Sequence, residues 1–246
     1  MLSIEQIELY YQSVYNRDLE IHGFEVLSRL RSQKGMQSGE FLQWIENNEV
    51  IVDLTLKQIS TVCELRNKGI NCKFSININE FTLASSRFLD AACLIPVKYL
   101  DKISLEISEK INLRDRDDLI FALDKMSQYG YSLGLDDFFS EHSSTLPIMT
   151  AKVSFIKADM SIIRSYKQSQ VNRNLLKTMI YFCNLSSIPS IAEGVDSLET
   201  YYELHGMGID FFQGYLFSKP VPLDEMLLLY KQYRINMEEF FCGKGE

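Results

Sequence analysis

The segment Glu8–Leu30, which reads "ELYYQSVYNRDLEIHGFEVLSRL", predicts two strands that lie side by side. Both ends of the segment are rich in aromatic, β-branched and other apolar side chains, as strands commonly are. The link around "NRDLEI" is too short for the crossover helix that two parallel strands would need. The chain therefore begins with an antiparallel hairpin.

Six further runs of this kind follow along the chain, and segments with helical periodicity separate most of them. The runs read "CKFSININ", "KISLEISE", "YSLGLDDF", "KVSFIKAD", "IPSIAEGV" and "IDFFQGYLF". Strands that alternate with helices indicate a mostly parallel sheet, and eight strands favour a closed barrel. We therefore predict an α/β fold, a modified TIM-like (β/α)8 barrel with an antiparallel first strand.

Three helices between these strands can be placed from the sequence. In Arg114–Tyr129 the apolar residues recur at helical spacing, and Gly130 follows as the expected helix end. A longer helical stretch, Ser161–Cys183, carries polar insertions. A third helix, Ser197–His205, is expected to end at Gly206. The segment "PLDEMLLLYKQY" near the C-terminus also has helical spacing and predicts a helix that packs on the domain.

No Pro/Gly/Ser-rich linker, low-complexity segment or internal repeat divides the 246 residues. We therefore predict a single domain over residues 1–236 and a C-terminal tail over residues 237–246. The N-terminal residues lack the basic start and apolar stretch of a signal peptide, and no apolar run reaches the roughly 20 residues of a membrane span.

The composition bounds the partners and the location of the chain. A net charge of −8 leaves no basic excess to neutralise phosphates, so a nucleic-acid duplex is not an expected partner. The five cysteines lack zinc-like spacing, and we expect reduced thiols in a cytoplasmic protein. Two histidines, His22 and His205, are expected at the surface.

Polar side chains stand at the ends of most predicted strands, where the active sites of such barrels lie. They are Glu25, Asn77, Asn79, Glu106, Glu109, Asp136, Asp137, Lys157, Asp159, Glu193 and Gln213. A single acid at a strand end is more often a helix cap or a partner for loop backbone. Here several strands in turn bring carboxylate or amide oxygens to the same face.

Carboxylates that share one pocket cannot all ionise without counter-charge. Hard divalent cations such as Mg²⁺ or Mn²⁺ favour carboxylate and amide oxygens, and the sequence has no histidine or cysteine cluster for zinc or iron–sulfur. An all-oxygen site for two metals suits hydrolysis of a phosphoester by an activated water. The alternative for Lys157 is a plain salt bridge to Asp136 or Asp137.

From Tyr10 to Pro222, the motifs at these strand ends together resemble the EAL domain, the cyclic di-GMP phosphodiesterase of bacterial second-messenger signalling. The matching motifs are "YYQ" (10–12), "FEVLSR" (24–29), "SININ" (75–79), "LEISE" (105–109), "LDDF" (135–138), "IKAD" (156–159), "AEGVD" (192–196) and "QGYLFSKP" (213–220). Each motif alone is a weak signal, and their order makes the resemblance specific.

The resemblance implies Mg²⁺- or Mn²⁺-dependent hydrolysis of cyclic di-GMP to linear pGpG by two metals that activate water. The implied metal ligands are Glu25, Asn77, Glu106, Asp136, Asp137 and Glu193. The implied catalytic residues are Lys157, Glu193, Glu25 and Asp137. The implied substrate-binding residues are Gln12, Leu27, Arg29, Gln213 and Asp159. Glu109 matches the glutamate that anchors the loop after the fifth strand. The family commonly dimerises through helices near the fifth and sixth strands, so the resemblance also implies a homodimer.

The chain departs from this family at several positions. Ser13 stands where a proline usually follows the "YQ". After Asp137, the family's "FGTGYSS" is replaced by "FFSEHSS", so that Phe139 and Glu141 stand where glycines allow positive φ. This loop is implicated in metal binding and dimer coupling. The alternative to an active enzyme is therefore a catalytically weak or inactive EAL-like regulator that binds cyclic di-GMP or a partner protein.

Overall fold

The computed structural model describes the backbone of residues 4–31, 45, 50–108, 111–138 and 152–242. The predicted loop anchor Glu109 and the altered loop residues 139–144 lie outside the described residues.

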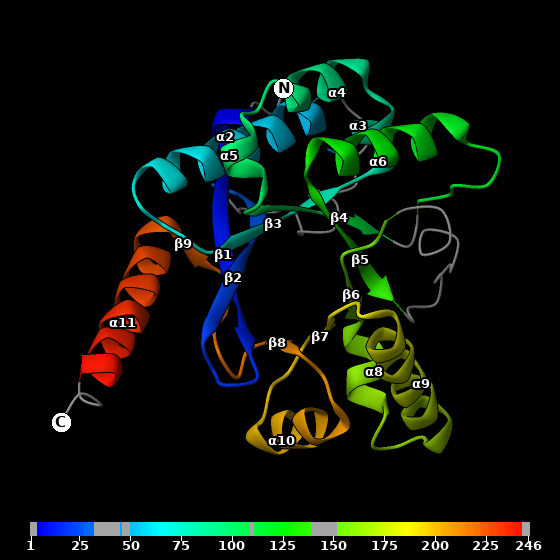
Figure 1. The fold of residues 1–246 in the computed structure, drawn as a ribbon, viewed down its shortest axis with the longest axis vertical. Coiled ribbons are helices and arrows are strands. Elements are labelled where there is room, and N and C mark those ends of the chain that lie inside the picture. Colours follow the sequence, from blue (N-terminus) through cyan, green and yellow to red (C-terminus); the bar gives the residue numbers. More distant parts are fainter. Residues whose placement is uncertain (1–3, 32–44, 46–49, 109–110, 139–151, 243–246) are drawn as a thin grey trace.

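Eight strands close into a barrel with helices on its outside, which confirms the predicted fold (Figure 1). The strands are β1 (Ile7–Asn16), β2 (Ile21–Leu30), β3 (Lys73–Ile78), β4 (Ile103–Ser108), β5 (Ser132–Phe138), β6 (Phe155–Ala158), β7 (Ser190–Ala192) and β8 (Phe211–Gln213). Neighbours from β2 to β8 are parallel, whereas β1 is antiparallel to both β2 and β8. A short strand, β9 (Val221–Pro222), pairs with β1 beside the ring.

The hairpin between β1 and β2 is held by the side chain of Asn16. Its Oδ1 accepts hydrogen bonds from the backbone N–H groups of Asp18 (3.0 Å) and Glu20 (2.8 Å), as Asn does in many turns. The hairpin register places Gln12 opposite Glu25. The antiparallel first strand therefore adds a side chain to the site that the parallel strands build.

The helices between the strands are α2 (Val50–Asn67), α3 (Glu80–Ala84), α4 (Ser86–Cys93), α5 (Val97–Leu100), α6 (Asp117–Tyr129), α8 (Met160–Ser165), α9 (Gln170–Ser186) and α10 (Leu198–Met207), with a 3-10 turn, η1 (Ile4–Gln6), before β1. The predicted end of α6 at Gly130 is confirmed, with φ of +110°.

Two helix predictions were wrong in detail. The stretch Ser161–Cys183 is not one helix, because α8 ends at Ser165 and the hydroxyl of Ser169 starts α9 by accepting from the backbone N–H of Asn172. The third helix does not end at Gly206. It continues to Met207, and Gly208 closes it with φ of +100°.

The last helix, α11 (Leu223–Cys242), extends away from the barrel in Figure 1. Its buried side chains Met226 and Tyr230 pack into the cluster beneath β1–β5, so the segment is a packing helix at its start, as its spacing predicts. The helix continues past residue 236, and the division into a domain and a tail stays a prediction. Among the described residues, no helix combines the length and apolar character needed to cross a bilayer.

Candidate active site

A buried lysine lies at the centre of the carboxyl ends of the strands. Lys157, on β6, is 1% exposed, and its Nζ lies 2.7 Å from Glu193, 2.9 Å from Glu106, 2.9 Å from Asp136 and 3.5 Å from Glu25. Burial alone would lower the pKa of Lys157, but these four carboxylates raise it well above its ordinary value. The lysine is therefore held as a cation.

The carboxylate of Glu25, on β2, is fixed by two amides. Asn77 Nδ2, on β3, donates to Glu25 Oε1 at 2.8 Å, and Gln213 Nε2, at the end of β8, donates to Glu25 Oε2 at 2.6 Å. Burial favours the neutral form of Glu25, but Lys157 and these two hydrogen bonds outweigh it, and the net pKa is lowered. Glu25 is thus an ionised, oriented carboxylate.

Two other carboxyl groups lack this support. Burial, together with the charges of Glu25 and Asp136, raises the pKa of Glu106 to about 8 in spite of Lys157. Burial likewise raises the pKa of Glu193 well above its ordinary value, with Asp136 and Glu25 adding to the effect. The site is therefore short of positive charge as it stands.

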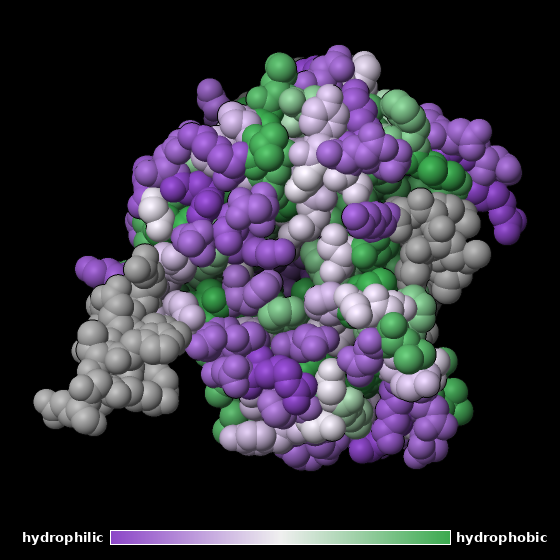
Figure 2. All heavy atoms as spheres, in the orientation of Figure 1, coloured by the Kyte–Doolittle hydropathy of each residue, from purple (hydrophilic) through white to green (hydrophobic). Residues whose placement is uncertain are grey.

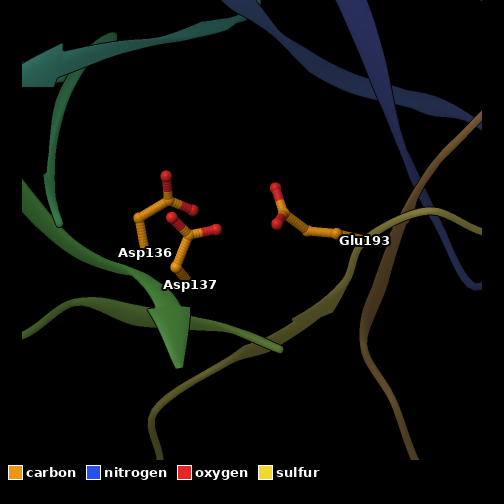
Figure 3. A group of neighbouring side chains, drawn as sticks. All are labelled: Asp136, Asp137 and Glu193. Atoms are coloured by element: carbon orange, nitrogen blue, oxygen red, sulfur yellow. The ribbon is translucent and has the colours of Figure 1, made fainter. Parts of the chain in front are cut away.

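Asp136 and Asp137 reach the same region although they are adjacent in a strand. Neighbouring strand residues ordinarily point to opposite faces. Here Asp137 has φ of +52°, a conformation that Asp adopts more readily than most residues, and the pairing of β5 with β6 shifts register between Leu135 and Phe138. Figure 3 shows both carboxylates facing that of Glu193. Ligand oxygens of the three lie within 4.8 Å of one another.

Glu193 directly follows β7, and the next residue, Gly194, has a backbone conformation that favours glycine. Its φ is +66°, and a Cβ there would stand 2.4 Å from the side chain of Met160, so glycine is required on both counts.

A buried amide oxygen in the site has no partner. Gln213 is 3% exposed, and its Nε2 serves Glu25 and the Oε1 of Gln12, at 3.2 Å from the latter. Its own Oε1 is buried and, within the described part of the chain, unpaired. Buried polar atoms are nearly always satisfied, so this oxygen marks a place for a donor that the chain does not supply.

Three other predicted substrate-binding residues, Leu27, Arg29 and Asp159, make no hydrogen bond to the acidic cluster among the described residues. Leu27 and Arg29 follow Glu25 on the same face of β2, both half-buried, and Arg29 Nη1 donates to the carbonyl of Ser28. Asp159 is half-buried, but its Oδ1 accepts from the backbone N–H of Ser161 and caps α8.

Sequence reasoning missed the part played by Ser218. Its carbonyl accepts from Gln12 Nε2 at 3.2 Å, and its Oγ lies 2.5 Å from the Oγ of Ser13. These bonds tie β1 to the loop after β8. The serine at position 13, where the family has proline, supplies half of this link, and only the fold could reveal a contact between residues so far apart in sequence.

The comparisons with known proteins agree with this geometry. A family model described as the EAL domain matches residues 1–220, and the chain belongs to this family. The cyclic di-GMP phosphodiesterase PdeR of Escherichia coli is 27% identical over 242 residues, which cover 94% of this chain and 36% of PdeR. The chain spans about a third to a half of the length of such curated relatives.

Solved structures match over most of this chain. The EAL enzyme Bd1971, in a form with cAMP and cyclic di-GMP bound, superposes with a TM-score of 0.81 at 28% identity, over 92% of this chain and 65% of that one. An EAL domain protein from Listeria monocytogenes superposes with a TM-score of 0.79 at 25% identity, over 92% of this chain and 93% of that one.

Proposed function

We propose that this chain is a metal-dependent phosphodiesterase that hydrolyses one ester bond of cyclic di-GMP and gives linear pGpG. The observation that carries the proposal is the excess of acid at the barrel mouth. Five carboxylates gather there: Glu25, Glu106, Asp136, Asp137 and Glu193. Among the described residues, Lys157 is the cation that pairs with members of this cluster. A pocket so acidic would repel an anionic phosphodiester unless cations were bound in it.

The donor set fits Mg²⁺ or Mn²⁺. It consists of carboxylates and amides without histidine or thiol, and the raised pKa values of Glu106 and Glu193 indicate missing positive charge. The residues that would hold two ions are Glu25, Asn77, Glu106, Asp136, Asp137 and Glu193. When bound, such ions supply an activated water and neutralise charge on the phosphoryl group.

The chain's own residues supply the rest. Lys157 keeps Glu25, Glu106, Asp136 and Glu193 within one cluster and holds its proton there. The unpaired Oε1 of Gln213 can accept a hydrogen bond from a water at the cluster.

Substrate would be held by residues at the rim and on β2. Arg29, on the same strand face as Glu25, suits a phosphate oxygen, because guanidinium groups bind phosphate with paired hydrogen bonds. Gln12, Leu27 and Asp159 remain the other proposed contacts. In the reaction, the water oxygen bonds to phosphorus, the bond to the ribose oxygen breaks, and that oxygen gains a proton.

The test is turnover by purified protein with Mg²⁺ or Mn²⁺, followed by chromatography of pGpG. Glu25→Ala removes a carboxylate that Lys157, Asn77 and Gln213 all contact, and we expect at least a hundredfold loss of rate. Glu199→Ala, at an exposed position on α10, is the matched control and should keep the wild-type rate. No turnover by the wild-type chain, with cyclic di-GMP still bound, would favour the regulator instead.

We also propose a homodimer. Its support is a row of exposed apolar side chains on α9, made of Val171, Leu175, Phe182 and Leu185. These positions share one helical face, separate from the buried face of Leu176, Met179, Ile180 and Cys183.

A further inference from the structure

A cavity of about 100 Å³ lies inside the barrel at the amino-terminal ends of the strands. It is lined by strand residues two positions before those of the acidic site. Gly23 precedes Glu25 in this way, Ser75 precedes Asn77, and Ser104 precedes Glu106. Because strand side chains alternate, these residues face the same interior one layer lower. They are all small, and the layer is therefore left incompletely filled.

Large aromatic side chains from the other half of the barrel fill part of this layer. Phe155 lies directly over Gly134, where an added Cβ would stand 2.1 Å from its ring. Phe211 lies against His22, with ring centroids 4.1 Å apart. The remaining cavity thus has an apolar wall of Phe155 and Phe211. His22, which the sequence predicts at the surface, is instead half-buried in the cavity lining.

Of the five polar side chains that line the cavity, Ser154 accepts a hydrogen bond from the backbone N–H of Leu133, and the other four make no hydrogen bond or ion pair with another described residue. They are His22, Lys73, Ser75 and Ser104. Ser104 is only 2% exposed, and its side chain lines the cavity. The other three side chains are half-buried. Together, four polar side chains without protein partners around one cavity offer hydrogen-bonding groups to a polar ligand.

A cationic side chain, Lys73, lines the cavity. Burial, with the charges of Lys73 and Lys102, lowers the pKa of His22 to about 4, so its ring is neutral at pH 7. Burial and Lys102 also lower the pKa of Lys73. The nearby carboxylate of Asp101 pairs with Lys102 at 3.6 Å, and no acid lines the cavity among the described residues.

We propose that this cavity binds a short-chain organic carboxylate, with its apolar body against Phe155 and Phe211 and its carboxylate toward Lys73 and the hydroxyls of Ser75 and Ser104. An engineered cavity of about 150 Å³ holds benzene, so this one suits a smaller body. The cavity lies in the same barrel as the acidic cluster, but it would bind an anion, whereas the acidic cluster would bind cations.

The probe is butyrate, with butyramide as its neutral counterpart. The melting temperature of the full chain is measured against the concentration of each at constant ionic strength. EDTA is present throughout, so that no divalent ion in the acidic site can hold the carboxylate. Butyrate should raise the melting temperature with saturation, and butyramide should not. An equal effect of both compounds, or no saturable effect of butyrate, would overturn the proposal.

Two variants locate the effect. Lys73→Gln removes the positive charge but keeps a polar side chain, and it should weaken the apparent affinity for butyrate at least tenfold. The control Lys98→Gln, exposed on α5, should leave it unchanged. Ser104→Leu fills the cavity and should abolish the effect in folded protein. If Lys73→Gln binds butyrate as the wild type does, the carboxylate does not lie in this cavity and the proposal fails. None of these outcomes depends on phosphodiesterase activity.

Discussion

Lys157 shows how a single buried cation can organise an acidic site without neutralising it. Its ammonium group reaches Glu25, Glu106, Asp136 and Glu193, yet the pKa values of Glu106 and Glu193 still rise. A buried charge that lacks a full partner is among the most destabilising features a fold can hold. The folded chain therefore tolerates local instability at the place where it would bind cations.

Glu106 makes this instability measurable as a pH dependence. Its pKa is about 8 in the folded chain and 4.5 ordinarily, so between these values the folded state holds a proton that the unfolded state has lost. Stability must then fall as pH rises through this window. In EDTA, the free energy of urea unfolding should drop from pH 5.5 to pH 8 by an amount on the order of 2 kcal/mol.

The variant Glu106→Gln removes this ionisation and should flatten the profile, although Glu193 contributes in the same direction. The matched control Glu199→Gln, at an exposed acid, should keep the wild-type slope. A wild-type stability that is constant or rises over this range would contradict the account of the site.

At the scale of elements, the end of β5 has an irregular backbone that its sequence does not predict. The adjacent acids predict a site at the strand end, but regular alternation would send Asp136 and Asp137 to opposite faces. The positive φ at Asp137 and the register shift beside it bring them together. Such a bulge depends on the pairing between β5 and β6, which one strand's sequence does not encode.

Helix α9 carries the prediction at this scale, because its outer face is apolar. If Phe182 and Leu185 lie in a homodimer interface, the double variant Phe182→Glu, Leu185→Lys should shift the mass in light scattering from dimer to monomer. The control Lys177→Glu, at an exposed position on another face of α9, should disturb the association less. A wild-type chain that is monomeric at tens of micromolar concentration would contradict the dimer.

At the scale of the whole molecule, the sequence was sufficient for the barrel. The hairpin in Glu8–Leu30 and the alternation of strands and helices predict the topology that the structure has. The arrangement within the site was not predictable. The bond from Gln12 to Ser218 and the central place of Lys157 depend on barrel closure, which brings distant segments into contact.

The two ends of the closed barrel also carry different charged groups. Carboxylates gather at the carboxyl ends of the strands, whereas Lys73 and Lys102 lie at the amino ends. The face seen in Figure 2 is mostly hydrophilic and hollowed near its centre. We propose that the acidic end binds divalent cations, so the removal of these ions is the most direct test of the proposed function.

The most direct measurement is the formation of pGpG from cyclic di-GMP by protein stripped with EDTA, before and after Mn²⁺ or Mg²⁺ is restored. We expect no detectable product from the stripped protein and recovery of turnover with either ion, because the carboxylates around Lys157 need divalent counter-charge to accept the substrate. Turnover that chelation leaves unchanged, or its absence with both ions restored, would contradict the account.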